Sequence, residues 1–117
     1  MELNVENLVK AMNLEVVAGA HHLNKRVKGG YCGDLLSDVM ANSKEGDVWI
    51  TVQTHQNIVA VAVLKEHAAI IIAGNREADP ESIEKAEKEG IPLLRSPLNG
   101  FLVSGMLYKL FEQGENA

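Results

Sequence analysis

The sequence predicts a three-layer α/β/α sandwich built on a mostly parallel sheet of about four strands. Two observations predict it. Helix-like and strand-like segments alternate along the chain, which is typical of parallel strands joined by helical crossovers. Residues 46–52 (GDVWITV) and 68–74 (AAIIIAG) are nearly continuous apolar runs, as expected of parallel strands covered on both faces. With 117 residues, 46% of them apolar, the chain fits a single domain over 1–117.

The predicted elements follow one another without a linker or an internal repeat. They are a helix over 4–13, a strand over 14–19, an irregular segment over 20–33, a helix over 34–42, a strand over 46–52, a helix over 54–67, a strand over 68–74, a helix over 79–90, a strand over 91–94 and a helix over 96–114.

The first helix is predicted from Asn4, which can cap it, and from apolar residues that fall on one helical face. The strand over 14–19 ends at Gly19, and the segment over 20–33 is polar, rich in glycine and without a helical period. Asp34 is predicted to cap the second helix by accepting a hydrogen bond from the Ser37 amide.

Residues 58–64 are seven consecutive apolar residues, which fit either a buried strand or a buried helix. The connection decides between them, because two parallel neighbours need a crossover of about a dozen residues. We therefore predict a helix over 54–67, capped by Thr54. This helix is apolar nearly all round, so its outer side should be covered as well.

The last two helices share a start signal, a capping residue followed by proline. Asp79 and Pro80 begin the helix that ends at Gly90, and Ser96 and Pro97 are predicted to begin the final helix.

Composition excludes several classes of function. The net charge is −5 and no basic stretch is longer than NKRVK at 24–28, so neither nucleic acid nor an anionic membrane is expected as a partner. A single cysteine forms no internal disulfide, no signal peptide is apparent, and no apolar run could span a bilayer. We expect a soluble cytoplasmic protein.

The stretch from Gly30 to Asp47 contains Cys32, Asp34 and Asp38, which could form a reactive or metal-binding site. Two carboxylates without a nearby histidine or third acid rarely hold a cation, so we favour helix capping and dipole roles for them and expect no metal. Cys32 lacks an adjacent histidine; burial is the favoured interpretation, and activation by the following helix is the alternative. His21 and His22 are interpreted as polar residues of a loop and not as metal ligands.

A second candidate site follows from the fold. Ligands of open α/β sheets collect outside the carboxyl ends of the strands, where helix N-termini also point. Arg76 and Arg95 would make an anion pocket there, and solvated loops with caps are an equally good explanation. The candidate residues are Gln53, Thr54, His55, Asn57, Asn75, Arg76, Arg95 and Ser96.

Signatures of catalysis are missing from the sequence. It contains no phosphate-binding loop, no dinucleotide-binding turn, no HExxH and no GxSxG, and no Ser–His–Asp or Cys–His set is suggested by spacing. We therefore predict a non-enzyme that uses no cofactor.

Residues 29–94 carry a resemblance to the DRTGG domain family, through GDLLSDVMAN, GDVWITVQTHQNIVAVAVL and AAIIIAG in that order. The motif that names the family falls on residues 26–30 (RVKGG), of which only Gly29 and Gly30 match.

The resemblance implies a fold similar to the N-terminal domains of HPr kinase/phosphorylase and of Mur ligases, an α/β/α sandwich with a largely parallel sheet. It also implies a regulatory role that helps dimerisation, as in domains that accompany CBS domains in nucleotide-regulated pyrophosphatases. The serine-kinase label given to some stand-alone members does not suit a chain without a phosphate-binding loop.

Two hypotheses of function follow. The first is a non-catalytic regulatory or ligand-sensing domain that acts as a homodimer or through a protein partner, since the chain offers more apolar helix surface than one small sheet covers. The second is a binding protein for a nucleotide or another phosphorylated metabolite. The expected interface residues are Ile58, Val61, Leu64, Phe101, Met106 and Phe111.

Overall fold

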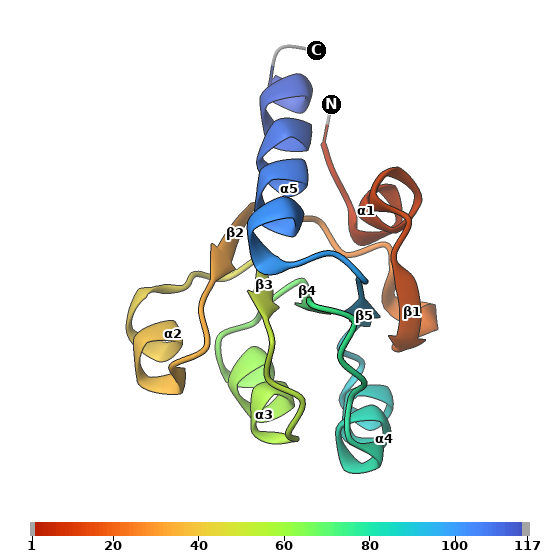
Figure 1. Ribbon diagram of the computed structural model, residues 1–117, viewed down its shortest axis with the longest axis vertical. Helices are drawn as coiled ribbons and strands as arrows, with labels where there is room; N and C mark the ends of the chain where they lie inside the picture. Colours follow the sequence, from red (N-terminus) through yellow and green to blue (C-terminus); the bar gives the residue numbers. More distant parts are fainter. Residues whose placement is uncertain (1, 116–117) are drawn as a thin grey trace.

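The computed structural model describes residues 2–115 and confirms the three layers (Figure 1). One helical layer contains α1 and α5, the other contains α2, α3 and α4, and the sheet lies between them. The helices are α1 (Val5–Met12), α2 (Leu36–Asn42), α3 (Asn57–Leu64), α4 (Pro80–Glu89) and α5 (Gly100–Glu115), with a short 3₁₀ turn, η1 (Ala20–His22).

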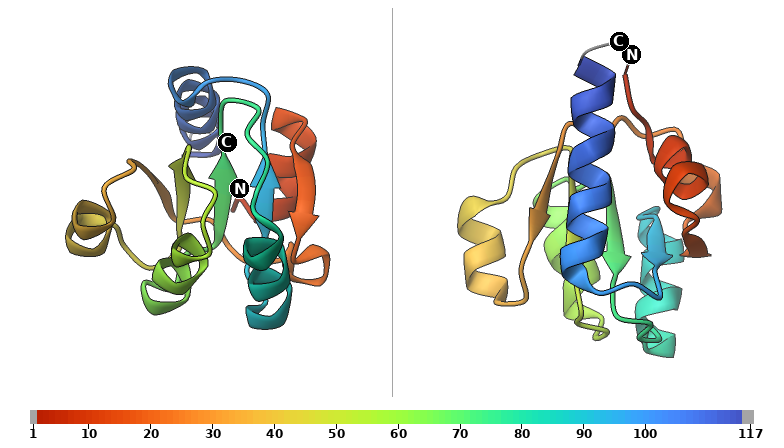
Figure 2. Two further views of the ribbon diagram at one scale, coloured as in Figure 1. Left: turned by 60° about the horizontal axis from the view of Figure 1, so that its bottom comes forward. Right: turned by 45° about the horizontal axis from the view of Figure 1, so that its top comes forward.

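The sheet has five strands in the order β1-β5-β4-β3-β2, not about four. Strands β2 to β5 are parallel, and only β1 runs antiparallel, against β5. The strands are β1 (Glu15–Ala18), β2 (Gly29–Cys32), β3 (Asp47–Thr51), β4 (Ala69–Ile72) and β5 (Leu93–Arg95). Because β2 to β5 step across the sheet in one direction, right-handed crossovers place α2, α3 and α4 on the same face. The left panel of Figure 2 shows α5 on the opposite face.

The additional strand is β2, which lies in the segment over 20–33 that was predicted to be irregular. Half of this strand is glycine, so it carries none of the alternation or β-branched enrichment that marks a strand in a sequence. Its pairing with β3, from Gly29 beside Asp47 to Cys32 beside Ile50, is a long-range contact that local pattern does not reveal.

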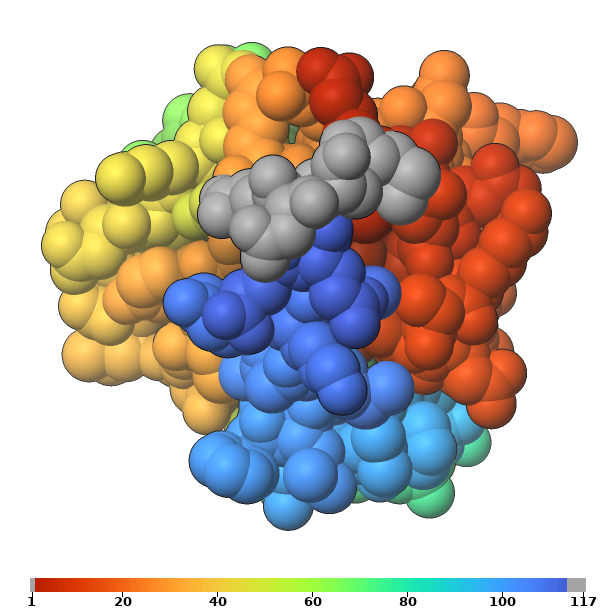
Figure 3. Space-filling view, turned by 90° about the horizontal axis from the view of Figure 1, so that it is seen from above, coloured from red at the N-terminus to blue at the C-terminus, as the bar shows by residue number. Residues whose placement is uncertain are grey.

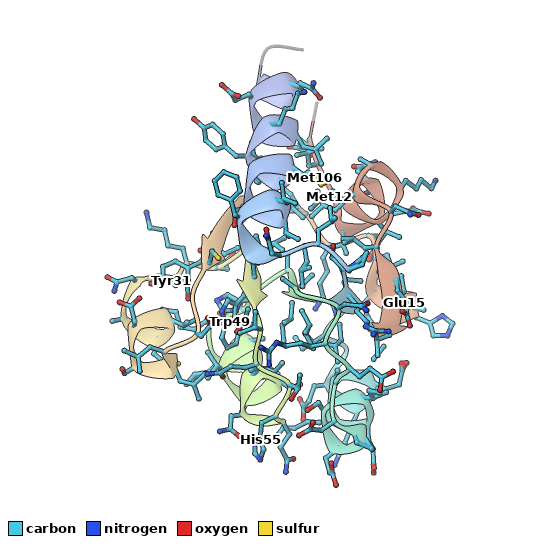
Figure 4. The ribbon with its side chains drawn as sticks, viewed as in Figure 1. Met12, Glu15, Tyr31, Trp49, His55 and Met106 are labelled. Atoms are coloured by element: carbon cyan, nitrogen blue, oxygen red, sulfur yellow. The ribbon has the colours of Figure 1, made fainter. Side chains whose placement is uncertain are left out.

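Each face of the sheet has its own apolar core. The core under α1 and α5 contains Leu8, Met12, Val48, Ile50, Ile71, Leu94, Val103 and Leu107, and Figure 4 shows Met12 beside Met106 of α5. The core under the other layer contains Val39, Trp49, Ile58, Val59, Ile70, Ile72, Ala86 and Leu93. The apolar runs of β3 and β4 are therefore buried on both faces, as predicted.

The first helix begins as predicted. Asn4 is its N-cap, and a reciprocal pair of hydrogen bonds, each of 2.8 Å, joins the side chains of Asn4 and Asn7 to each other's backbone amides. The helix α4 also has its expected bounds, with Pro80 in its first turn and Gly90 (φ 71°) at its end.

Three other helices begin later than predicted. The Asp34 carboxylate accepts hydrogen bonds from the Thr51 hydroxyl (2.7 Å) and the Val52 amide (2.9 Å), so α2 begins beyond it without a side-chain cap. The Thr54 carbonyl accepts from the Ser82 hydroxyl (2.6 Å), and α3 begins only at Asn57.

The final helix shows the same effect. Ser96 is buried, and its hydroxyl accepts a hydrogen bond from the Leu98 amide (3.1 Å) in a turn before the helix. The helix α5 begins at Gly100, where the Asn99 side chain accepts from the Leu102 amide (3.0 Å).

The outer side of α3 is not covered by the described part of the chain, contrary to the expectation. Ile58, Val59 and Ala62 face the sheet and are fully buried, whereas Val63 is 39% and Leu64 is 68% exposed. Among residues 2–115, no helix combines the length and the apolar character that crossing a membrane requires.

Candidate functional site

The loops predicted to form an anion pocket lie at the carboxyl edge of the parallel strands. The loop after β4 is tied to the loop after β5, since the Gly74 amide donates to the Leu98 carbonyl (2.7 Å) and the Asn75 amide donates to the Ser96 carbonyl (2.9 Å). Asn75 has a left-handed backbone (φ 60°). Asn75, Arg76, Arg95 and Ser96 are therefore brought together, as the fold predicts.

Arg95 directs its guanidinium at the protein itself. Its Nε donates to the Arg76 carbonyl (3.1 Å) and its Nη2 to the Asn75 carbonyl (2.9 Å), while Nη1 lies 3.4 Å from a Glu15 carboxylate oxygen. This arrangement makes Arg95 a clamp on the loop after β4. Arg76 differs, because within residues 2–115 its side chain makes no hydrogen bond or ion pair and is exposed.

The segment after β3 is arranged separately. The Gln53 side-chain amide donates to the Asp34 carbonyl, which ties this segment to the loop after β2. His55 is exposed and its Nδ1 accepts from the Asn57 amide (3.2 Å). Figure 4 shows His55 well apart from Glu15, the partner of Arg95. Thr54 of this segment is nevertheless tied to the start of α4, because its carbonyl accepts hydrogen bonds from the Asp79 amide (3.1 Å) and the Ser82 hydroxyl (2.6 Å).

A different surface, which sequence reasoning did not find, lies where β2 meets α5. A groove of about 230 Å³ runs between them, and its walls are mainly apolar. It is lined by Gly30, Cys32, Ile50, Ser104, Leu107, Tyr108 and Phe111. Cys32 is exposed here and not buried, which corrects the favoured interpretation of this residue. The groove was missed because β2 itself was missed.

Exposed apolar side chains also lie along α5. Phe101 is 84%, Leu102 is 46% and Tyr108 is 66% exposed, all on α5. Figure 3 shows α5 at the surface between α1 and the segment that contains β2 and α2. The face of α5 that points away from the sheet is thus more apolar than a solvent-facing helix requires.

The six residues predicted to form an interface are distributed over both helical layers. Ile58 is fully buried in the core and offers no surface, while Leu64 is exposed on α3. Phe101 is exposed on α5, and Val61, Met106 and Phe111 are partly buried. Because α3 and α5 cover opposite faces of the sheet, these residues make two separate patches (Figure 1).

The motif segment over 26–30 lies at the amino edge of the sheet. A Cβ added to Gly29 would lie 2.7 Å from a carboxylate oxygen of Asp47, and one added to Gly30 would lie 2.8 Å from Leu107 of α5. Both glycines are therefore where β2 passes close to its neighbours. A side chain at either position would require Asp47 or Leu107 to move aside.

A hollow of about 460 Å³ opens at the same edge. His67 contributes to its wall, and this residue is buried, with its ring edge-on to Trp49 at a centroid distance of 5.7 Å. Burial lowers the pKa of His67, and the nearby Asp47 partly opposes that shift. Within residues 2–115, no group of three or more histidine, cysteine or acidic side chains is arranged to hold a metal ion.

Comparison with known proteins gave a match to a family model and matches to solved structures. The model of the DRTGG domain family matches residues 7–110. A search of curated proteins found no match.

Among solved structures, one match is the crystal structure of the CBS and DRTGG domains of the regulatory region of Clostridium perfringens pyrophosphatase, complexed with the activator diadenosine tetraphosphate. The TM-score is 0.69 at 19% sequence identity, and the match covers 87% of this chain. It covers 44% of that chain, so this protein spans less than half of the pyrophosphatase fragment. At this level of sequence identity, the match shows that the two proteins share a fold and nothing more.

Proposed function

Because the chain belongs to the DRTGG domain family, we propose that it is a non-catalytic regulatory domain that acts as a homodimer. The observation that carries the proposal is the apolar face of α5 beside the unpaired edge of β2. Exposed apolar patches of this kind are typical of interaction surfaces.

The free edge of β2 suits pairing with a second copy. The Gly33 amide donates to the Ile50 carbonyl of β3 (3.1 Å). Alternate residues of a parallel strand bond to the same neighbour, so the backbone groups of Gly30 and Cys32 point away from β3. Edge strands with such unpaired groups readily accept another strand.

A dimer with its two-fold axis at Tyr31 would pair the free backbone groups of both Gly30 and Cys32. Antiparallel pairing of two β2 strands about this axis sets Gly30 of each copy opposite Cys32 of the other, so both exchange backbone hydrogen bonds. The same register sets Lys28 opposite Asp34, which have opposite charges. Because Gly30 and Cys32 line the groove, α5 of each copy would approach the axis on the same side.

Sedimentation velocity of the full chain tests this proposal. We expect a dimer at micromolar concentration and a monomer for Tyr108→Glu, which places a charge in the apolar face of α5. Cys32→Pro gives a second test, because it removes a backbone donor that the monomer does not use. Leu64→Lys on the opposite layer is the control and should remain dimeric. A monomeric wild-type chain, or loss of the dimer only with Leu64→Lys, would refute the β2–α5 surface; a wild-type monomer would favour a partner protein instead.

A second candidate function is binding of a nucleotide or another phosphorylated metabolite at the carboxyl edge. The observation that favours it is the exposed guanidinium of Arg76, which has no charged partner among residues 2–115. The matching pyrophosphatase structure contains a phosphorylated dinucleotide, which agrees with this chemistry. The proposed contacts are Gln53, Thr54, His55, Asn75, Arg76, Arg95 and Ser96.

Thermal-shift measurements with ATP, AMP and diadenosine tetraphosphate test this candidate. A ligand that binds only the folded chain raises the melting temperature. Arg76→Ala should abolish the increase, whereas Lys88→Ala, which removes a cation from the far end of α4, should not. If none of the three nucleotides stabilises the wild-type chain, the nucleotide hypothesis is rejected.

A further inference from the structure

The tautomer of His67 follows from its hydrogen bonds. Its Nε2 lies 2.9 Å from the Ser43 hydroxyl oxygen, and that hydroxyl donates its only proton to the Val39 carbonyl (2.6 Å). The proton between His67 and Ser43 must therefore belong to Nε2. The remaining nitrogen, Nδ1, is an acceptor when the ring is neutral.

No described residue donates to this acceptor. His67 is 2% exposed, and its Nδ1 is buried without a hydrogen-bond partner. Buried polar atoms nearly always have a partner, so this acceptor is able to take a hydrogen bond from a donor outside the chain. His67 lines the hollow of about 460 Å³ at the amino edge.

The charges of the hollow are only partly paired. Lys28 pairs with Glu45 (2.9 Å), and Arg26 lies 3.4 Å from Glu2. Lys25 donates to the Gly90 carbonyl (2.8 Å) and has no carboxylate partner among residues 2–115; partial burial lowers its pKa.

Two carboxylates of the same hollow also lack a cation. Within the described residues, neither Glu66 nor Glu89 forms an ion pair. The hollow therefore offers an unpaired cation and unpaired anions together, beside an apolar wall of Val63, Ala68 and Ile91.

We propose that this hollow binds a free amino acid with an apolar side chain. The ligand's ammonium group is a donor that suits Glu66, Glu89 and Nδ1 of His67, and its carboxylate suits Lys25. Its side chain would pack on Val63 and Ile91. A dianionic phosphate suits the hollow less well, because the unpaired carboxylates would repel it.

Contact with Nδ1 requires the atoms that cover it to move, since it is buried. Glu66 occupies the turn after α3 with a left-handed backbone (φ 55°), a conformation that a residue with a side chain adopts at a cost in energy. The movement would occur in this turn.

Nuclear magnetic resonance of the ¹⁵N-labelled full chain, titrated with leucine, isoleucine, valine, methionine and phenylalanine, tests the proposal. We expect at least one of them to shift the His67 ring nitrogens and the amides of residues 25–28 and 66–68. The amide and the N-acetyl derivative of that amino acid, which lack the carboxylate and the ammonium charge, should each bind about tenfold more weakly.

Lys25→Met and Glu66→Gly should each weaken binding about tenfold, and Glu66→Gly keeps the left-handed turn. Lys88→Met, outside the hollow, should leave binding unchanged. The proposal is overturned if no amino acid shifts these signals, if the derivatives bind equally well, or if the shifts occur only around Arg76 and Arg95. The site is distinct from the carboxyl-edge site and from the β2–α5 surface, so its failure leaves both proposed functions standing.

Discussion

Gly19 and Gly105 show that glycines of this chain serve opposite purposes. Gly19 follows β1 with φ 77°, and a Cβ there would lie 2.6 Å from the Ile91 carbonyl oxygen. Gly105 is exposed within α5, and a Cβ there would meet nothing within 4 Å. The first is a close approach of two backbone segments, whereas the second only weakens a helix.

We therefore predict opposite effects of alanine at these positions. Gly19→Ala should lower the free energy of unfolding by about 2 kcal/mol or more, since backbone cannot move aside easily. Gly105→Ala should raise it by about 0.5 to 1 kcal/mol. Urea denaturation followed by the fluorescence of Trp49, the single tryptophan, measures both. Equal effects of the two substitutions would contradict the assignment.

His67 should make stability depend on pH. Burial lowers its pKa below the ordinary value of 6.5, so on acidification the unfolded chain binds a proton before the folded chain does. The free energy of unfolding should then fall as pH decreases below about 6.5, with a slope of up to about 1.4 kcal/mol per pH unit.

The variant His67→Gln isolates this contribution, because it keeps a polar side chain beside Ser43 and does not titrate. Its free energy of unfolding should depend less steeply on pH than that of the wild-type chain over the weakly acidic range. Parallel pH dependences of the two proteins would show that His67 takes up its proton equally in both states.

At the scale of the elements, the chain contains two helix starts that look alike in sequence and differ in structure. Asn4 exchanges side-chain and backbone hydrogen bonds with Asn7 at the start of α1. Asp79 occupies the same position of α4, but its side chain makes no capping hydrogen bond. A capping residue type therefore does not establish a capping contact.

This difference predicts that Asn4→Ala destabilises the chain by about 1 kcal/mol, because it leaves helix amides unpaired. Asp79→Ala should cost about 0.5 kcal/mol or less, the value of a carboxylate near a helix N-terminus. Urea denaturation of the two variants gives the comparison. A larger loss from Asp79→Ala would mean that Asp79 does cap α4 in solution.

The same reasoning explains how much of the fold the sequence could predict. The strands β3 and β4 and the helices α1 and α4 follow from local pattern, and the structure confirms them. The starts of α2 and α5 could not be predicted, because the side chains of Asp34 and Ser96 bond to another part of the fold or to a preceding turn. The helix α3 begins at Asn57 without any side-chain cap. Polar residues that can cap can equally bind elsewhere, and sequence does not show which contact wins.

The candidate sites divide in the same way. The gathering of Asn75, Arg76, Arg95 and Ser96 follows from the rule that parallel strands end at one edge. That Arg95 clamps backbone carbonyls is a matter of side-chain direction, which the sequence does not contain. The β2–α5 groove and the orphaned nitrogen of His67 both depend on long-range contacts, so no local signal indicates them.

At the scale of the whole molecule, more apolar surface is left exposed on one side of the sheet than on the other. The extents are 39 × 28 × 23 Å, and α5 lies along the long direction and beside β2 (Figure 1). Because β2 is an edge strand, its outer edge has no strand partner among the described residues. The exposed apolar face of α5 lies on the same side. The apolar patch on α3 is smaller and lies on the other face, so one interface cannot use both.

A homodimer through β2 and α5 should therefore make thermal stability depend on protein concentration. Folding and association are linked by mass action, so a tenfold rise in concentration should raise the melting temperature by about 3 °C. The buried Trp49, whose indole donates to the Gly33 carbonyl (2.8 Å) next to β2, is a suitable fluorescent reporter. Tyr108→Glu should melt at the same temperature at every concentration, whereas Leu64→Lys should keep the dependence. A wild-type melting temperature that does not change with concentration would exclude a dimer linked to folding, because mass action admits no other result for a chain that dissociates as it unfolds.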